Sequence, residues 1–125
     1  MPGQAFPKKL HVRTRREFSA VFEPHVRISR GPLLLYGVPN RLDHCRLGLS
    51  TPRRVGIAVV RNRIRRLLRE SFRLLQHELP PGYDLIMVVR PHEPMALAEY
   101  QRLLRGLCIA LDAVWRKKAR SDSPG

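Results

Sequence analysis

Apolar residues recur along the chain with two periods, one typical of helices and one typical of strands. Phe18, Val21 and Phe22 lie at helical spacing behind Thr14 and Glu17, which have the spacing of a capping box. We therefore expect a short helix over residues 15–23, ended by Pro24.

Apolar or alternating runs predict four strands, at residues 33–38, 46–50, 55–60 and 84–89. The turn-like residues NRLD between the first two runs favour an antiparallel pair of strands at that point. The run at 84–89 is apolar at nearly every position, which is typical of a strand buried on both faces.

Helical spacing returns in two longer segments, residues 61–77 and 95–118. The first ends before Pro80, Pro81 and Gly82. The predicted order is αβββαβα, and this mixture indicates an α/β two-layer sandwich in which helices pack on a mixed sheet. Residues 1–120 are expected to form a single domain, and the polar residues 121–125 a disordered tail.

The charge of the chain points to a polyanionic partner. The 125 residues include 24 Lys or Arg and 10 Asp or Glu, a net charge of +14, and 20 of the basic residues are Arg. A hydrophobic content of 43% excludes a disordered basic tail. Codon usage in a GC-rich genome is an alternative explanation for Arg in place of Lys, but it does not explain so few carboxylates.

The charge is concentrated in residues 53–73, which contain eight Arg and one Glu, a net +7. At 100° per residue, most of the polar side chains of the helix fall within an arc of about 140°, while Ile64, Leu67 and Leu68 lie on the other side. A solvated helix face is the alternative, but such faces usually mix the two signs of charge. We therefore expect this segment to bind phosphates. The candidate RNA-binding residues are Arg53, Arg54, Arg61, Asn62, Arg63, Arg65, Arg66, Arg69 and Arg73.

Asn62 is the one amide in this set. Its side chain both donates and accepts hydrogen bonds, so it is suited to a base edge or a ribose hydroxyl. An exposed asparagine near the start of a helix, without a ligand, is an equally acceptable interpretation.

Aromatic residues near basic residues form a second candidate site. Phe18 and Phe22 lie one helical turn apart, and Tyr36 lies on the first predicted strand. The arginines around them in sequence are Arg13, Arg15, Arg16, Arg27 and Arg30, of which Arg13 and Arg16 are the candidates for this site. Aromatic rings stack on unpaired bases while cations follow the backbone, so the set is suited to a single strand. The alternative is that the two phenylalanines belong to the core.

The sequence shows little catalytic machinery. Its carboxylates and histidines are scattered, and it has no glycine-rich phosphate loop and no nucleophile elbow. Cys45 and Cys108 lie far apart, so we expect two free thiols and no metal site in the protein. With no apolar run long enough for a signal peptide or a membrane span, we expect a cytoplasmic protein without membrane contact.

Taken together, these segments resemble the protein subunit of bacterial ribonuclease P. The residues that carry the resemblance are RNRIRRLLRESFR at 61–73, preceded by RLGLS and RRVGIAVV, with EFSAVF at 17–22 and YDLIMVVR at 83–90. The resemblance extends from about Val12 to Trp115.

The resemblance implies a protein that assists a catalytic RNA, which removes the 5′ leader of precursor tRNA with bound Mg²⁺. The arginines of 61–69 and Asn62 would face that RNA, with one protein per RNA. A cleft containing Phe18, Phe22 and Tyr36 would hold the leader. It also implies a left-handed βαβ crossover, where the general rule would favour the right hand. Two other functions stay open: an RNA-binding protein such as a ribosomal component or RNA chaperone, and a nuclease that needs no RNA.

Overall fold

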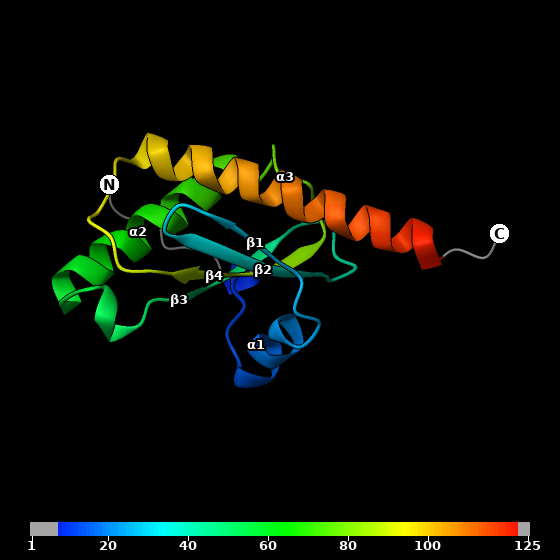
Figure 1. Ribbon diagram of the computed structural model, residues 1–125, viewed down its shortest axis with the longest axis horizontal. Coiled ribbons are helices and arrows are strands. Elements are labelled where there is room, and N and C mark those ends of the chain that lie inside the picture. Colours follow the sequence, from blue (N-terminus) through cyan, green and yellow to red (C-terminus); the bar gives the residue numbers. More distant parts are fainter. Residues whose placement is uncertain (1–7, 123–125) are drawn as a thin grey trace.

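The computed structural model describes residues 8–122, which form three α-helices on a four-stranded sheet (Figure 1). The order αβββαβα agrees with the expectation. The elements of this range are α1 Arg15–Phe22, β1 Arg27–Arg30, β2 Leu33–Pro39, β3 Arg46–Ser50, α2 Ala58–Leu75, β4 Tyr83–Val89 and α3 Leu97–Asp122, with short 3-10 helices η1 Lys8–Leu10 and η2 Arg53–Val55.

The sheet is mixed, with strand order β1-β2-β4-β3. β4 runs antiparallel to β2 and parallel to β3, so that Tyr36 and Gly48 both lie opposite Ile86. β1 and β2 form an antiparallel hairpin that turns at Gly31, whose φ of 54° is a conformation that glycine adopts without strain. α2 connects the parallel strands β3 and β4. The left hand expected for this crossover stays a prediction.

The helices cover both faces of the sheet. α2 and α3 lie on one face and α1 lies on the other (Figure 1). Because side chains alternate along a strand, Leu85 and Met87 of β4 join the core under α2 and α3, whereas Ile86 joins a smaller cluster under α1.

The larger core fixes α2 and α3 against the sheet. Ile64, Leu68 and Phe72 of α2 are at most 1% exposed, as are Tyr100 and Leu104 of α3. Burying such a side chain contributes about 1.5–3 kcal/mol. The anchored stripe of α2 determines which of its side chains are left to face solvent.

The strand expected over residues 55–60 is wrong. η2 ends at Val55, Ile57 is the N-cap of α2, and the helix begins at Ala58. The apolar run suggested burial, but Ile57 and Val59 are 72% and 73% exposed. The first turn of α2 thus carries apolar side chains in solvent, a pattern that sequence reasoning assigns to a strand.

The expected antiparallel pair of residues 33–38 and 46–50 is also wrong, because β4 lies between β2 and β3. A strand that is apolar on both faces is more stable at the centre of the sheet, where helices cover both sides. The strand that sequence reasoning missed is β1, an edge strand whose sequence RISR offers one apolar side chain. Because β1 was missed and residues 55–60 are not a strand, the sheet still has the expected four strands.

The helix ends differ modestly from the expected ones. α2 ends at Leu75, whereas α3 continues to Asp122 and so includes the first two residues of the expected disordered tail. Residues 123–125 lie outside the described residues. Within residues 8–122, no helix combines the length and the apolar character needed to cross a membrane.

Candidate nucleic-acid interface

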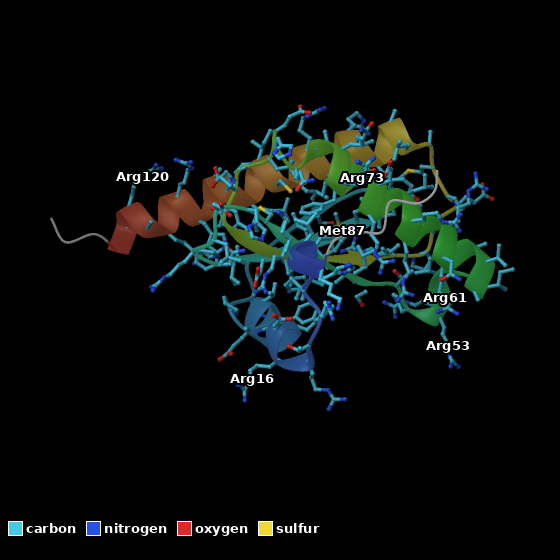
Figure 2. The ribbon with its side chains drawn as sticks, turned by 180° about the vertical axis from the view of Figure 1, so that it is seen from behind. Arg16, Arg53, Arg61, Arg73, Met87 and Arg120 are labelled. Atoms are coloured by element: carbon cyan, nitrogen blue, oxygen red, sulfur yellow. The ribbon has the colours of Figure 1, made fainter. Side chains whose placement is uncertain are left out.

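The arginines of α2 flank its buried stripe. Arg61, Arg65 and Arg69 follow one another at four-residue intervals beside this stripe and are half-buried, whereas Asn62, Arg63 and Arg66 are exposed. Arg53 and Arg54 are exposed on η2, and Figure 2 shows Arg53 and Arg61 at the same end of α2. We call these eight residues the arginine surface: Arg53, Arg54, Arg61, Asn62, Arg63, Arg65, Arg66 and Arg69.

This surface has cations without acids. Within residues 8–122, no ion pair involves an arginine of the arginine surface. Nε of Arg65 is buried and has no hydrogen-bond partner there. Burial, together with the charge of Arg65, lowers the pKa of Arg69, although a guanidinium remains protonated at neutral pH. The positive charge of this surface is therefore not neutralised by a described carboxylate.

Two arginines of the segment do have local partners. Arg61 donates from Nε to the carbonyl oxygen of Gly56 at 3.1 Å, which holds its side chain at the start of α2. Arg73 donates from Nε and Nη2 to the two carboxylate oxygens of Glu70, both at 2.8 Å. This pair raises the pKa of Arg73 and lowers that of Glu70. Arg73 was expected to belong to the RNA-binding set, but its guanidinium is engaged by an acid of the same helix.

On the opposite side of the sheet, Phe18, Phe22 and Tyr36 form a connected group that we call the aromatic patch. The ring centroids of Phe18 and Phe22 lie 6.3 Å apart, and those of Phe22 and Tyr36 lie 4.7 Å apart in an edge-to-face arrangement. All three side chains are partly exposed and rest on the small cluster of Val12, Val21 and Ile86. The sequence left a choice between core and binding platform, and the rings have both a buried and an exposed side.

The capping box expected at the start of α1 is confirmed. The backbone N–H of Glu17 donates to Thr14 Oγ1 at 3.1 Å, while Glu17 Oε1 accepts from the backbone N–H groups of Thr14 at 3.0 Å and Arg13 at 2.8 Å. These backbone donors, with the charge of Arg46, lower the pKa of Glu17. α1 therefore begins at a defined residue, which fixes the phase of Phe18 and Phe22.

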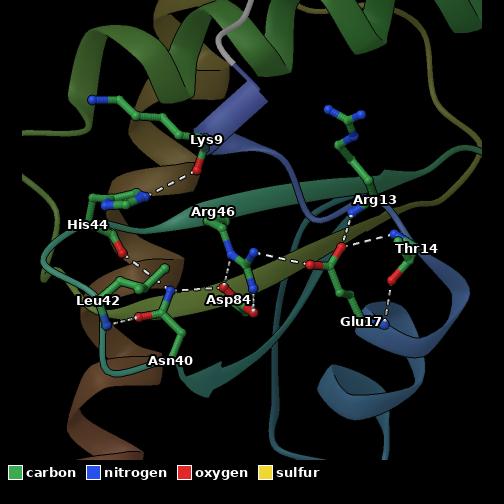
Figure 3. A network of polar contacts seen from close by, with 9 residues as sticks. All are labelled: Lys9, Arg13, Thr14, Glu17, Asn40, Leu42, His44, Arg46 and Asp84. Atoms are coloured by element: carbon green, nitrogen blue, oxygen red, sulfur yellow. Dashed lines mark hydrogen bonds and ion pairs between the residues drawn. The ribbon is translucent and has the colours of Figure 1, made fainter.

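Of the two basic residues expected beside the aromatic rings, Arg16 points away from Phe18, whereas the expectation for Arg13 stays a prediction. Arg16 is about 160° from Phe18 around the helix axis, and Figure 2 shows its side chain projecting away from the sheet. Arg13 lies before the helix, near Glu17, with its guanidinium directed away from that carboxylate (Figure 3). A third cation, Arg27, lies against Tyr36, with its guanidinium carbon 5.9 Å from the ring centroid.

Sequence reasoning also missed a polar network centred on Arg46 of β3 (Figure 3). Arg46 donates to both carboxylate oxygens of Asp84 at 2.7 and 2.5 Å, and to Glu17 Oε2 at 3.1 Å. Asn40 donates from its amide to the same Asp84 at 2.8 Å. The network therefore joins α1 to β3 and β4, beside the aromatic patch.

A signal for this network was present in the sequence. Asp84 is the one charged residue of β4, and a carboxylate buried in such a strand needs a cation. Which of 20 arginines supplies it depends on the pairing of β3 with β4, which places Arg46 opposite Asp84.

The described residues offer little for metal chemistry. Within residues 8–122, no group of three or more His, Cys, Asp or Glu side chains is placed to hold a metal ion. Cys45 and Cys108 are both buried free thiols, and burial raises the pKa of each.

Fold and charge define a small, strongly basic α+β domain, and comparison with known proteins identifies its family. The ribonuclease P family model matches residues 6–117. A ribonuclease P protein component from Photorhabdus laumondii subsp. laumondii is 43% identical over 117 residues, covering 93% of this chain and 92% of that protein. The one from Klebsiella pneumoniae is 39% identical over the same shares of both chains.

Solved structures agree with the sequence matches. The RNase P protein from Thermotoga maritima has a TM-score of 0.70 and 27% identity, over 78% of this chain and 94% of that one. The Staphylococcus aureus RNase P protein has a TM-score of 0.68 and 27% identity, over 78% of this chain and 91% of that one. The chain belongs to the ribonuclease P protein family. Membership in this family implies a role in tRNA processing and an RNA partner.

Proposed function

We propose that this chain is the protein component of a cytoplasmic ribonuclease P, with one protein per catalytic RNA. The arginine surface binds the catalytic RNA, and the aromatic patch binds the single-stranded 5′ leader of precursor tRNA. The observation that carries the proposal is the arginine surface itself: seven guanidinium groups without an ion pair within residues 8–122. Five of them are on α2, whose buried stripe anchors the helix, and two are on η2.

The arginine surface and the aromatic patch lie on opposite faces of the sheet, so each can contact a different RNA. Each guanidinium that contacts a phosphate neutralises part of its charge, which lowers the repulsion between catalyst and substrate RNA, and the released counterions favour binding. The aromatic rings stack on unpaired bases and so distinguish a leader from a mature 5′ end. Together they hold precursor tRNA on the catalytic RNA.

Bond cleavage is assigned to the RNA partner. Mg²⁺ held by that RNA would activate the attacking water and stabilise the leaving oxygen. In this proposal the protein contributes binding and orientation through the arginine surface and the aromatic patch.

Reconstitution tests this assignment. Purified, RNA-free protein is incubated with precursor tRNA, with and without the catalytic RNA, at a Mg²⁺ concentration too low for the RNA to act well alone. We expect cleavage only when both components are present. Cleavage by the protein alone would instead support a nuclease that needs no RNA, and failure to stimulate the RNA would support an RNA-binding protein of another kind.

The Phe22→Ala variant tests the aromatic patch. We expect it to lose about 1–3 kcal/mol of preference for leader-bearing over mature tRNA, the contribution of one stacked base. The preference is measured as the ratio of the two dissociation constants of the reconstituted holoenzyme. Ile109→Ala, which shortens an exposed apolar side chain on α3, is the matched control and should keep the ratio. An unchanged ratio in a folded Phe22→Ala protein would remove the patch from the proposal.

A further inference from the structure

Arg27 occupies a defined position on the edge strand β1, beside the aromatic patch. It pairs with Tyr36 across the β1–β2 ladder, so both side chains leave the sheet on the face that carries α1. Its guanidinium lies over the Tyr36 ring, and Nη1 lies 3.4 Å from the Tyr36 hydroxyl oxygen, a weak hydrogen bond. The tyrosine ring thus contacts both Phe22 and a cation.

The guanidinium of Arg27 keeps most of its donors. Arginine has five N–H groups in a planar fork, and the one described contact engages a single nitrogen. The side chain is exposed, and within residues 8–122 no ion pair involves it. Cation–π contact with Tyr36 orients the fork, and the one described hydrogen bond leaves Nε and Nη2 for another acceptor.

The acids on this side of the sheet do not compete for Arg27. Glu17 and Asp84 are both bound to Arg46. Glu23, at the end of α1, is exposed and makes no ion pair within the described residues. An anion that reaches the aromatic patch therefore meets an oriented cation there.

We propose that Arg27 is a phosphate-binding residue that completes the aromatic patch. One nucleotide of a single-stranded RNA places its base on the Phe22–Tyr36 pair, and a phosphate next to that base accepts two hydrogen bonds from Nε and Nη2 of Arg27. This inference rests on the proposed function, because it takes the leader as the strand that is bound. The leader is then held by two contacts: a stacked base, and a backbone phosphate whose binding does not depend on the RNA sequence.

The same strand supplies a matched control. Arg30 lies three residues further along β1, is likewise exposed, and points to the other face of the sheet. A Cβ at Gly106 of α3 would lie 2.5 Å from its Nη1, so Arg30 packs against α3, away from the aromatic patch. Arg27→Gln and Arg30→Gln remove the same charge from the same strand on opposite faces.

The test measures the affinity of each reconstituted holoenzyme for precursor tRNA with a single-stranded leader and for the same tRNA without it, over a series of salt concentrations. We expect Arg27→Gln to reduce the preference for the leader about 3- to 10-fold. The salt dependence of that preference should fall by about 0.7 in log–log slope, the value for one phosphate of a single strand. Arg30→Gln should keep both quantities.

The outcomes separate this inference from the proposed function. If Arg27→Gln keeps the wild-type preference while Phe22→Ala loses it, Arg27 binds no phosphate and the function stands. If the two arginine variants lose the preference equally, the effect is one of net charge and the inference fails. If wild-type protein shows no preference for the leader, the assignment of the patch fails first. Arg27→Lys separates a bidentate contact from simple charge attraction, because lysine keeps the charge but not the planar fork. If the lysine variant kept the preference, bidentate binding would be excluded.

Discussion

Gly48 shows how one residue controls the aromatic patch. It lies on β3 beneath α1, and a Cβ built there would come within 2.8 Å of the Phe18 ring and 3.1 Å of the carbonyl oxygen of Val12. Only a residue without a side chain allows the Phe18 ring to rest on the sheet. The position of Phe18 thus depends on a glycine that the sequence does not mark as special.

Gly48→Ala is expected to destabilise the fold by about 1–3 kcal/mol and to displace Phe18, since inserting one methyl group into a packed site has a cost of that size. The preference of the holoenzyme for leader-bearing tRNA should fall at a temperature where the variant is still folded. Denaturant unfolding and the ratio of dissociation constants measure the two effects.

Gly37→Ala supplies the comparison, because its Cβ would meet Leu111 at 2.3 Å and Leu85 at 2.8 Å in the larger core. It should destabilise the protein at least as much while keeping the preference for the leader. Equal loss of preference in the two variants would show that stability, and not the position of Phe18, controls binding.

Sequence reasoning joined Phe18 and Phe22 by their spacing on a helix, which is a local property. The assignment of these two residues and Tyr36 to one cleft came from the family resemblance. Sequence reasoning could not find that Arg27 lies on Tyr36 or that Arg16 points away from the rings. Those facts depend on the β1–β2 register and on the rotation of α1, which is set by packing against Val12 and Ile86.

At the scale of elements, α1 is the one described helix on its face of the sheet, and two kinds of contact hold it. Apolar packing under Val21 is one, and the Glu17–Arg46–Asp84 network is the other. The apolar contact sets the distance of α1 from the sheet. The ion pair fixes the end of the helix that precedes Phe18.

Glu17→Gln removes the link to Arg46 and leaves an amide oxygen for the capping box. We expect a loss of about 0.5–1 kcal/mol at neutral pH, the range of a partly exposed ion pair. Because the folded protein lowers the pKa of Glu17 below its ordinary 4.5, the ionised group stabilises the fold fully above that pH. Its contribution disappears as the pH falls through the lower folded-state pKa.

The measurement is the difference in unfolding free energy between wild type and variant, from pH 7 down to pH 3. Glu78→Gln breaks a comparable exposed pair with Arg105 on the far side of the protein and serves as the control. If the difference between wild type and Glu17→Gln stayed constant down to pH 3, Glu17 would not be the group responsible.

The sequence predicted α1, α2, α3, β2, β3 and β4 within a few residues because each has a strong apolar period. It failed where the period misleads: Ile57 and Val59 look like strand residues but are exposed around the start of α2. The sequence did not predict which strands are neighbours, because the parallel pairing of β3 with β4 joins segments far apart in the chain.

For the molecule as a whole, the net charge of +14 predicts strong salt dependence. The affinity for catalytic RNA should fall with log salt at about 0.7–0.9 per phosphate contacted. Arg65→Ala should weaken assembly and reduce this slope by about one phosphate. Because Nε of Arg65 is buried without a partner, the variant should not lose stability from that group.

Arg105→Ala is the control for assembly, because Arg105 is on α3 and pairs with Glu78. It removes the same charge from the molecule, so an identical change of slope in both variants would indicate attraction by net charge alone. Titration of labelled catalytic RNA at several salt concentrations distinguishes the two.

The central position of β4 in the sheet has a consequence for the nascent chain. β4 is made after α2, yet it lies between β2 and β3 and carries Ile86, the residue on which the aromatic patch rests. During translation the cationic helix is therefore complete before the sheet that orients it can close. A nascent chain that stops short of Tyr83 would attract nucleic acid of any kind without being able to recognise a leader, so selectivity would arrive with the last third of the polypeptide.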